Sequence, residues 1–140
     1  MSQENVDLIR RMFRAGEAMS LDDLRASLPD LIAEFADPDI VWIEGPARID
    51  GRTYRGHDGV REALQHWYED FAEYSYDLRE LLDCGDHVLV VAREEARGAT
   101  SGATVAGGSY YLFTIRAGKV SRFRGFASRA EALRAAGLAE

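Results

Sequence analysis

The hydrophobic and polar positions change most sharply in residues 86–98, an apolar run that turns charged partway along, which we expect to form a strand with residues 109–127 as its partner. Strand-forming residues follow His87 and give way to a charged tract at Arg93. Because side chains alternate between the two faces of a strand, Leu89, Arg93 and Glu95 are expected to share one face. That face runs from the core to a charged end, which either enters solvent or lines a cavity.

Other runs, rich in β-branched and aromatic residues or alternating along the chain as in residues 76–84, predict further strands. These runs are residues 40–44, 53–55, 76–84, 110–115 and 120–127. We expect a turn at residues 37–39, an end of the first strand at Gly45-Pro46, and a flexible glycine-rich loop at residues 98–108. Short turns join the last four strands, which predicts antiparallel neighbours.

Apolar residues at spacings of three and four predict helices. Residues 4–18 form the first, and Ser20 is expected to cap a second helix whose continuation is limited by Pro29. Asp58 is expected to cap the longest helix, and Ser128 to open a short final helix within a capping box. The apolar stripe of the longest helix consists of Val60, Leu64, Trp67 and Phe71.

These elements predict one α+β domain spanning residues 1–140, with helices packed on one face of a curved antiparallel sheet. Residues 88–91 are apolar on both faces of their strand. Helices on one side would leave the convex face of the sheet uncovered, so we expect a homodimer formed through that face.

Composition narrows the class of protein. Hydrophobic residues make up 46% of the 140 residues and charged residues 29%, as is normal for a globular domain. A net charge of -7 argues against nucleic acid and anionic membranes as partners, because both require a basic face. Cys84 is the only cysteine, so no disulfide forms within the chain.

The first residues lack the features of a signal peptide and no apolar run is long enough to span a membrane, so we expect a cytoplasmic protein.

Five tracts carry a further pattern, and they are residues 35–42, 54–60, 85–88, 113–120 and 129–138. With the order of elements, they resemble SnoaL-like proteins of the nuclear transport factor 2-like superfamily over nearly the whole chain. The resemblance implies a cone-shaped, cystatin-like α+β barrel, in which a curved antiparallel sheet wraps around the N-terminal helices and one long helix. A pocket is expected at its open end. The superfamily includes ketosteroid isomerases, polyketide cyclases, limonene-epoxide hydrolases and dehydratases, so function must be argued from the site.

Glu44 is the first candidate catalytic residue. It shares a strand face with Trp42, and the tract Glu44-Gly-Pro46 is similar to the ketosteroid isomerase strand in which a general-base aspartate precedes a proline. An apolar pocket disfavours the charged form of a carboxylate, which suits proton transfer. The alternative is that Glu44 is a solvated residue at the end of a strand.

The tract Arg93-x-Glu95 is the second candidate and resembles the arginine-x-aspartate of limonene-epoxide hydrolases, which activate water with two aspartates and an arginine. Gly125 stands at the position of the second aspartate, so that member is absent here. Arg93 and Glu95 are expected either to act in the pocket, with Arg93 as a fixed cation, or to form a cross-strand ion pair of little net value.

Aromatic residues complete the candidate site. Tyr54 and Tyr110 are candidate donors to a developing oxyanion, and an aromatic lining suits a small, mostly hydrophobic ligand. The alternative is that these rings only form the core. The expected lining residues are Trp42, Trp67, Phe71, Tyr110, Phe123 and Phe126. The histidines lack metal-ligand spacing and the loop at 98–108 lacks the lysine of a phosphate-binding loop, so we expect no metal and no cofactor.

Three hypotheses follow. The first is a cofactor-independent enzyme that isomerises, cyclises or dehydrates a small hydrophobic carbonyl or polyketide-like compound. Glu44 would be its general acid/base, and Arg93 with Glu95, or a tyrosine such as Tyr54, would stabilise the developing charge. The second is a ligand-binding or assembly module of the same fold without catalysis. The third is epoxide hydrolysis at Arg93 and Glu95, which Gly125 puts in doubt.

Overall fold

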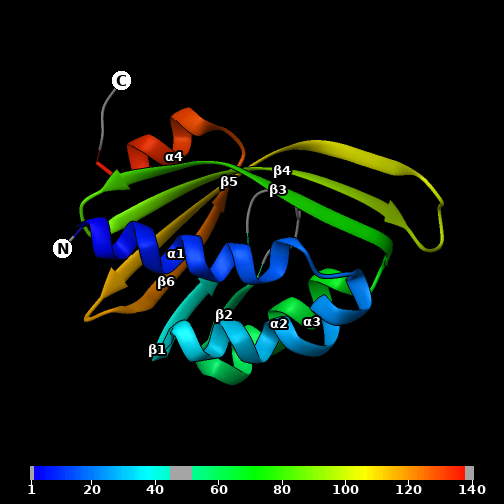
Figure 1. The fold of residues 1–140 in the computed structure, drawn as a ribbon, viewed down its shortest axis with the longest axis horizontal. Coiled ribbons are helices and arrows are strands. Elements are labelled where there is room, and N and C mark those ends of the chain that lie inside the picture. Colours follow the sequence, from blue (N-terminus) through cyan, green and yellow to red (C-terminus); the bar gives the residue numbers. More distant parts are fainter. Residues whose placement is uncertain (1, 45–51, 138–140) are drawn as a thin grey trace.

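The computed structural model describes residues 2–44 and 52–137, in which six strands form one curved sheet (Figure 1). The strands are β1 (Ala36–Ile43), β2 (Thr53–Arg55), β3 (Phe71–Cys84), β4 (His87–Gly98), β5 (Thr104–Arg116) and β6 (Lys119–Phe126). Their order across the sheet is β2-β1-β6-β5-β4-β3. Neighbouring strands are antiparallel except for β1 and β6, which run parallel.

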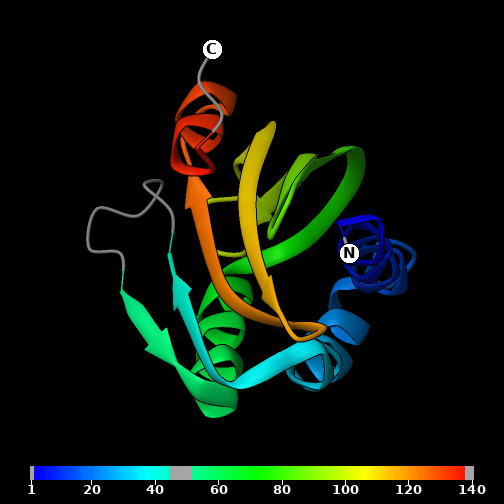
Figure 2. The same ribbon diagram turned by 90° about the vertical axis from the view of Figure 1, so that its left-hand side faces the viewer.

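Four helices accompany the sheet in the described residues: α1 (Ser2–Glu17), α2 (Leu21–Phe35), α3 (Gly56–Tyr68) and α4 (Arg129–Ala135). The sheet curves around α1, α2 and α3, and α4 lies apart from them (Figure 2). The main core forms where these three helices meet the concave face of the sheet, and its most deeply buried residues include Ile9, Leu24, Val60, Val88, Val90 and Phe113. The expected α+β fold is therefore confirmed. None of the described helices has both the length and the apolar character that crossing a bilayer requires.

The opposite face of the sheet carries a second, smaller core. Leu89 and Leu112 are buried there with Ala132 of α4, which packs against β4, β5 and β6. This helix explains part of the two-sided apolar character of β4, because residues on one face meet the main core and Leu89 meets α4. The homodimer expected from that pattern stays a prediction.

Helix α2 begins as predicted and continues through Pro29, the residue expected to limit it. The Ser20 hydroxyl accepts a hydrogen bond from the Asp23 N–H at 3.2 Å, which confirms Ser20 as the N-cap. Pro29 does not stop the helix, which continues to Phe35. Leu28, Pro29 and Ile32 are all buried, so packing of this face offsets the hydrogen bond that a proline cannot donate.

Helix α3 ends earlier than the apolar stripe indicated. It stops at Tyr68, and Phe71 is the first residue of β3. The Arg25 side chain of α2 donates from Nη2 to the carbonyl oxygens of Tyr68, at 2.8 Å, and Phe71, at 2.5 Å. A side chain of the neighbouring helix thus satisfies the carbonyl groups at this turn, which stabilises the end of α3 before Phe71.

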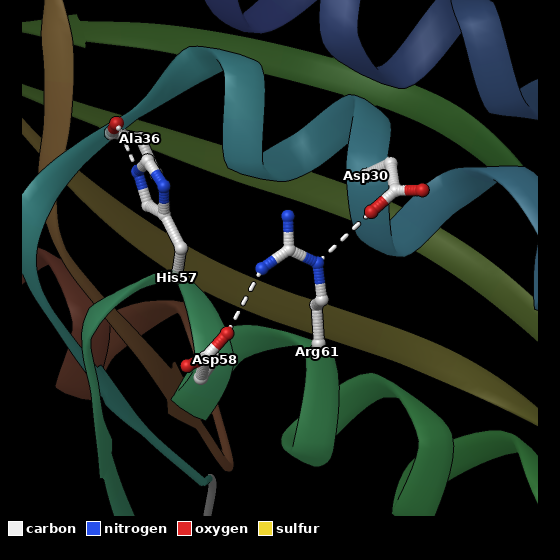
Figure 3. Close-up of polar contacts among 5 residues, drawn as sticks. All are labelled: Asp30, Ala36, His57, Asp58 and Arg61. Atoms are coloured by element: carbon white, nitrogen blue, oxygen red, sulfur yellow. Dashed lines mark hydrogen bonds and ion pairs between the residues drawn. The ribbon is translucent and has the colours of Figure 1, made fainter.

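The start of α3 also differs from the prediction. Arg55 is the N-cap residue and makes no side-chain cap, and Asp58 lies in the first turn. Figure 3 shows Asp58 paired with Arg61, which also contacts Asp30 of α2, with distances of 3.1 and 2.9 Å. His57 Nε2 lies 2.9 Å from the Ala36 carbonyl oxygen. These contacts attach the start of α3 to α2 and to the beginning of β1.

Two segments predicted as irregular are strands. Residues 37–39, expected as a turn, belong to β1, although the pairing of β1 with β6 is irregular between Ala36 and Val41. Residues 104–108, expected as part of a loop, belong to β5 and pair with β4. Backbone hydrogen bonds to a neighbouring strand need no side chain, so glycine-rich residues extend the hairpin. The strand end predicted at Gly45-Pro46 lies outside the described residues.

Candidate ligand-binding site

A cavity of about 450 Å³ is lined by side chains of α1, α2 and α3 and of every strand except β2. Pockets for small ligands have volumes of about 300–1,000 Å³ and mostly apolar walls. Aromatic rings form much of this wall, and they include Trp42, Trp67, Tyr68, Tyr74, Tyr111 and Phe123. The cavity therefore has the size and the surface that suit a small hydrophobic molecule.

The Glu94 carboxylate of β4 is the centre of a polar cluster in the cavity wall. Tyr111 donates a hydrogen bond to Glu94 Oε1 at 2.7 Å, and the Ser109 hydroxyl donates to the same oxygen. Tyr74 donates to Oε2. Tyr74 belongs to β3, and Ser109 and Tyr111 belong to β5, so the two strands that flank β4 assemble the cluster.

The tyrosine hydroxyls around Glu94 hold their protons firmly. Burial raises the pKa of Tyr74 and of Tyr111 well above the ordinary value, and the negative charge of Glu94 raises both further. Burial is also the largest cause of the raised pKa of Tyr68 and of Tyr76, to which the Glu94 charge contributes. At neutral pH these groups are therefore neutral phenols, which carry a proton that can be donated.

Glu44 contributes a second carboxylate to the cavity wall. It follows β1 directly and is half-buried, and its backbone N–H donates to the Arg52 carbonyl oxygen at 3.0 Å. Trp42, two residues earlier, stacks on Phe123 of β6 with ring centroids 3.9 Å apart. The structure thus brings Glu44, Trp42 and Phe123 together at the cavity.

Tyr54 lies near this carboxylate and outside the cavity lining. It is buried opposite Trp42 in the pairing of β2 with β1. Burial is the largest cause of its raised pKa, and the neighbouring Glu44 carboxylate is the next.

Arg93 and Glu95 do not meet at the cavity. Both side chains are exposed, and neither is among the cavity-lining residues. Their neighbour Glu94 lines the cavity, because alternation along β4 places it on the same face as Val90 and Ala92. Of the two alternatives for the face shared by Leu89, Arg93 and Glu95, the structure bears out the first: α4 covers Leu89, and the charged end of this face reaches solvent. The placement of Arg93 and Glu95 in the pocket is therefore corrected.

Most of the expected lining residues lie where the sequence indicated. The cavity wall includes Trp42, Trp67, Tyr110, Phe123 and Phe126, and also Gly125. Phe71 is not part of the lining, because it begins β3 and packs edge-on against Trp67. The sequence pattern had placed Phe71 on the apolar stripe of α3, but α3 ends at Tyr68.

The sequence pattern pointed to Arg93 and Glu95, which lie on the face of β4 opposite to Glu94. A signal for it was present. Glu94 continues the alternation of Val88, Val90 and Ala92, and Ser109 and Tyr111 alternate in the same way on the partner strand. In the described part of the chain, no group of three or more His, Cys, Asp or Glu side chains is arranged to hold a metal ion.

Solved structures of the same fold come from several sources. TerC, co-crystallised with polyporic acid, is 21% identical with a TM-score of 0.70, covering 96% of this chain and 98% of that one. A candidate SnoaL-like polyketide cyclase from Jannaschia sp. CCS1 is 21% identical with a TM-score of 0.72, covering 96% of this chain and 91% of that one. A hypothetical protein with a ketosteroid isomerase-like fold from Catenulispora acidiphila DSM 44928, in complex with trimethylamine, is 16% identical with a TM-score of 0.67. The alignment covers 91% of this chain and 92% of that one.

These identities are low, so the structural similarity shows the fold alone. No curated protein matches the chain. The model of the SnoaL-like domain matches residues 9–123, which run from the middle of α1 into β6. This match, which the resemblance of the sequence tracts predicted, covers most of the 140 residues, and the chain therefore belongs to the SnoaL-like domain family.

Proposed function

We propose that this protein binds a small, largely hydrophobic carbonyl or polyketide-like compound in the cavity and catalyses a cofactor-independent proton transfer on it. The reaction class is isomerisation, cyclisation or dehydration. The observation that carries this proposal is the aromatic cavity of about 450 Å³, whose wall contains the Glu44 and Glu94 carboxylates. An apolar site with a few fixed polar groups orients a small molecule and strengthens electrostatic interactions with it.

Glu44 is the proposed general acid/base. It is half-buried beside the stacked rings of Trp42 and Phe123, where a bound hydrophobic molecule would contact it. Glu94 lies within the strand β4, where three hydroxyl groups donate to its oxygens and fix its orientation in the cavity wall. We therefore assign proton transfer to Glu44 and ligand positioning to the cluster around Glu94.

The similar structures lend support to the ligand class. One contains polyporic acid and another trimethylamine, so small organic molecules bind to proteins of this fold. A module that binds its ligand without transforming it would use the same cavity. Epoxide hydrolysis is not proposed, because Arg93 and Glu95 are exposed and Gly125 lines the cavity where a third carboxylate would be required.

Proton abstraction is testable with 5-nitrobenzisoxazole, a small aromatic compound that loses its ring C–H proton to a base. The N–O bond then breaks and a coloured cyanophenolate forms. We expect turnover by the wild-type protein, and a loss of about 10²-fold in kcat/KM in Glu44→Gln, which is within the usual contribution of a general base. Glu4→Gln makes the same charge change at an exposed position of α1 outside the cavity lining and serves as the control.

Binding is measured separately by the fluorescence of Trp42 and Trp67, which both line the cavity and are the only two tryptophans of the chain. Saturable binding without turnover contradicts the catalytic part of the proposal and supports a binding module. Turnover that survives Glu44→Gln contradicts the assignment of Glu44 as the base.

A further inference from the structure

The charge of Glu94 has no cationic partner in the described part of the chain. None of the Lys, Arg and His side chains there forms an ion pair with it, and none of them lines the cavity. The basic residues nearest to it along β4 are directed elsewhere: Arg93 is exposed, and Arg97 pairs with Glu73 at 2.7 Å. A carboxylate in an apolar wall is costly unless it is hydrogen-bonded or paired, and here hydroxyl groups supply all of the observed contacts.

These hydroxyl groups leave the site rich in acceptors and poor in donors. Tyr74, Ser109 and Tyr111 each have one O–H proton, and each donates it to Glu94. What remains available to a ligand is the lone pairs of the hydroxyl oxygens and the negative charge of the carboxylate. A ligand that brings hydrogen-bond donors or a positive charge complements this arrangement, whereas an anionic ligand is repelled.

The aromatic side chains around Glu94 are a second feature of the cavity that favours a cationic ligand. Tyr68, Tyr74, Tyr76 and Tyr111 all line the cavity, and the Glu94 charge contributes to the raised pKa of each of these four phenols. The faces of aromatic rings carry partial negative charge and attract alkylammonium groups, most strongly where water is excluded. Rings and carboxylate therefore favour the same sign of charge in the ligand.

This inference rests on the proposed function. We propose that the hydrophobic compound carries a protonated amino group, which binds beside Glu94 among the side chains of the four cavity-lining tyrosines named above. Glu94 is then a specificity-determining residue, which selects an ammonium ion over a neutral or anionic compound of the same shape. Glu44 keeps its separate role in proton transfer.

Three probes with a common phenyl ring test this assignment: 2-phenylethylamine, 2-phenylethanol and 3-phenylpropanoate. They carry a positive charge, no charge and a negative charge at neutral pH. Dissociation constants are measured by tryptophan fluorescence and checked by calorimetry. We expect the amine to bind about tenfold more tightly than the alcohol, as for a hydrogen bond to a charged group, and the carboxylate to bind most weakly.

Glu94→Gln removes the charge with little change of shape. It should bring the dissociation constant of the amine to within about threefold of that of the alcohol and leave binding of the alcohol unchanged. Glu4→Gln, the exposed control, should preserve the preference for the amine. The comparison of the three probes on the wild-type protein needs no variant, so the inference remains testable even if Glu94→Gln does not fold.

The outcomes separate the two proposals. Equal binding of the amine and the alcohol to the wild-type protein overturns the ammonium assignment and leaves the cavity as a ligand site. A preference for the amine that persists in folded Glu94→Gln also overturns the role of Glu94. If none of the three probes binds, the ammonium assignment and the proposed ligand site both fail.

Discussion

The Tyr111 hydroxyl donates a hydrogen bond of 2.7 Å to the Glu94 carboxylate, from one strand of the central hairpin to the other. Together with Tyr74 and Ser109, this contact places a hydrogen-bonded carboxylate in the wall of an otherwise aromatic cavity. The cluster joins β3, β4 and β5, so it contributes both to the cohesion of the sheet and to the chemistry of the cavity.

The two adjacent glutamates of β4 should differ in their effect on stability. Glu94→Gln leaves buried hydroxyl groups with a poorer acceptor and should lower the free energy of unfolding by about 1–3 kcal/mol. Glu95→Gln alters an exposed side chain and should change it by no more than about 0.5 kcal/mol. Urea denaturation of both variants measures the difference, and equal effects would contradict the assignment of the two faces of β4.

Stability should fall at alkaline pH. Tyr74 and Tyr111 have pKa values raised by burial above the ordinary value of about 10, so above that pH the unfolded chain releases phenolic protons that the folded chain retains. This contribution is fully present below pH of about 10 and decreases as pH rises towards the folded pKa values. Urea denaturation over a series of pH values measures the slope, which should be shallower in Tyr111→Phe. An equal slope in both proteins would contradict the prediction.

Arg25→Met should destabilise the end of α3. The Arg25 guanidinium donates to the carbonyl oxygens of Tyr68 and Phe71, and methionine removes both hydrogen bonds while keeping an unbranched apolar stem. We expect a loss of about 1–2 kcal/mol in the free energy of unfolding, since the side chain is partly exposed. Arg11→Met, at an exposed position of α1, is the matched control and should have an effect below about 0.5 kcal/mol.

The convex face of the sheet should mediate a homodimer. Helix α4 covers Leu89 and Leu112, and Val91 remains half-buried beside them in the single chain. Burial of the remaining apolar surface by a second copy is the expected completion of this face. Light scattering at micromolar concentration measures the molar mass in solution. A molar mass equal to that of one chain would contradict the homodimer and show that α4 alone covers this face of the sheet.

Local chemistry in the sequence accounts for much of the fold. The Ser20 and Ser128 hydroxyls both cap their helices, as the pattern predicted, because an N-cap needs only a side-chain oxygen and nearby backbone N–H groups. Strand alternation and short turns also predicted the order of the last four strands. The same local signals brought Trp42, Trp67 and Phe123 into the expected lining.

Contacts between distant segments decided the features that local sequence patterns did not predict. Alternation along β4 shows that Glu94 and Glu95 lie on opposite faces, but which face meets the cavity depends on where α1, α2 and α3 pack and where α4 packs. The end of α3 depends on Arg25 from another helix, and the strand at residues 104–108 depends on pairing with β4. The sequence by itself thus determined the elements, their order and the family. The tertiary structure alone decided which carboxylate of β4 faces the cavity, because a strand has two equivalent faces until other elements cover them.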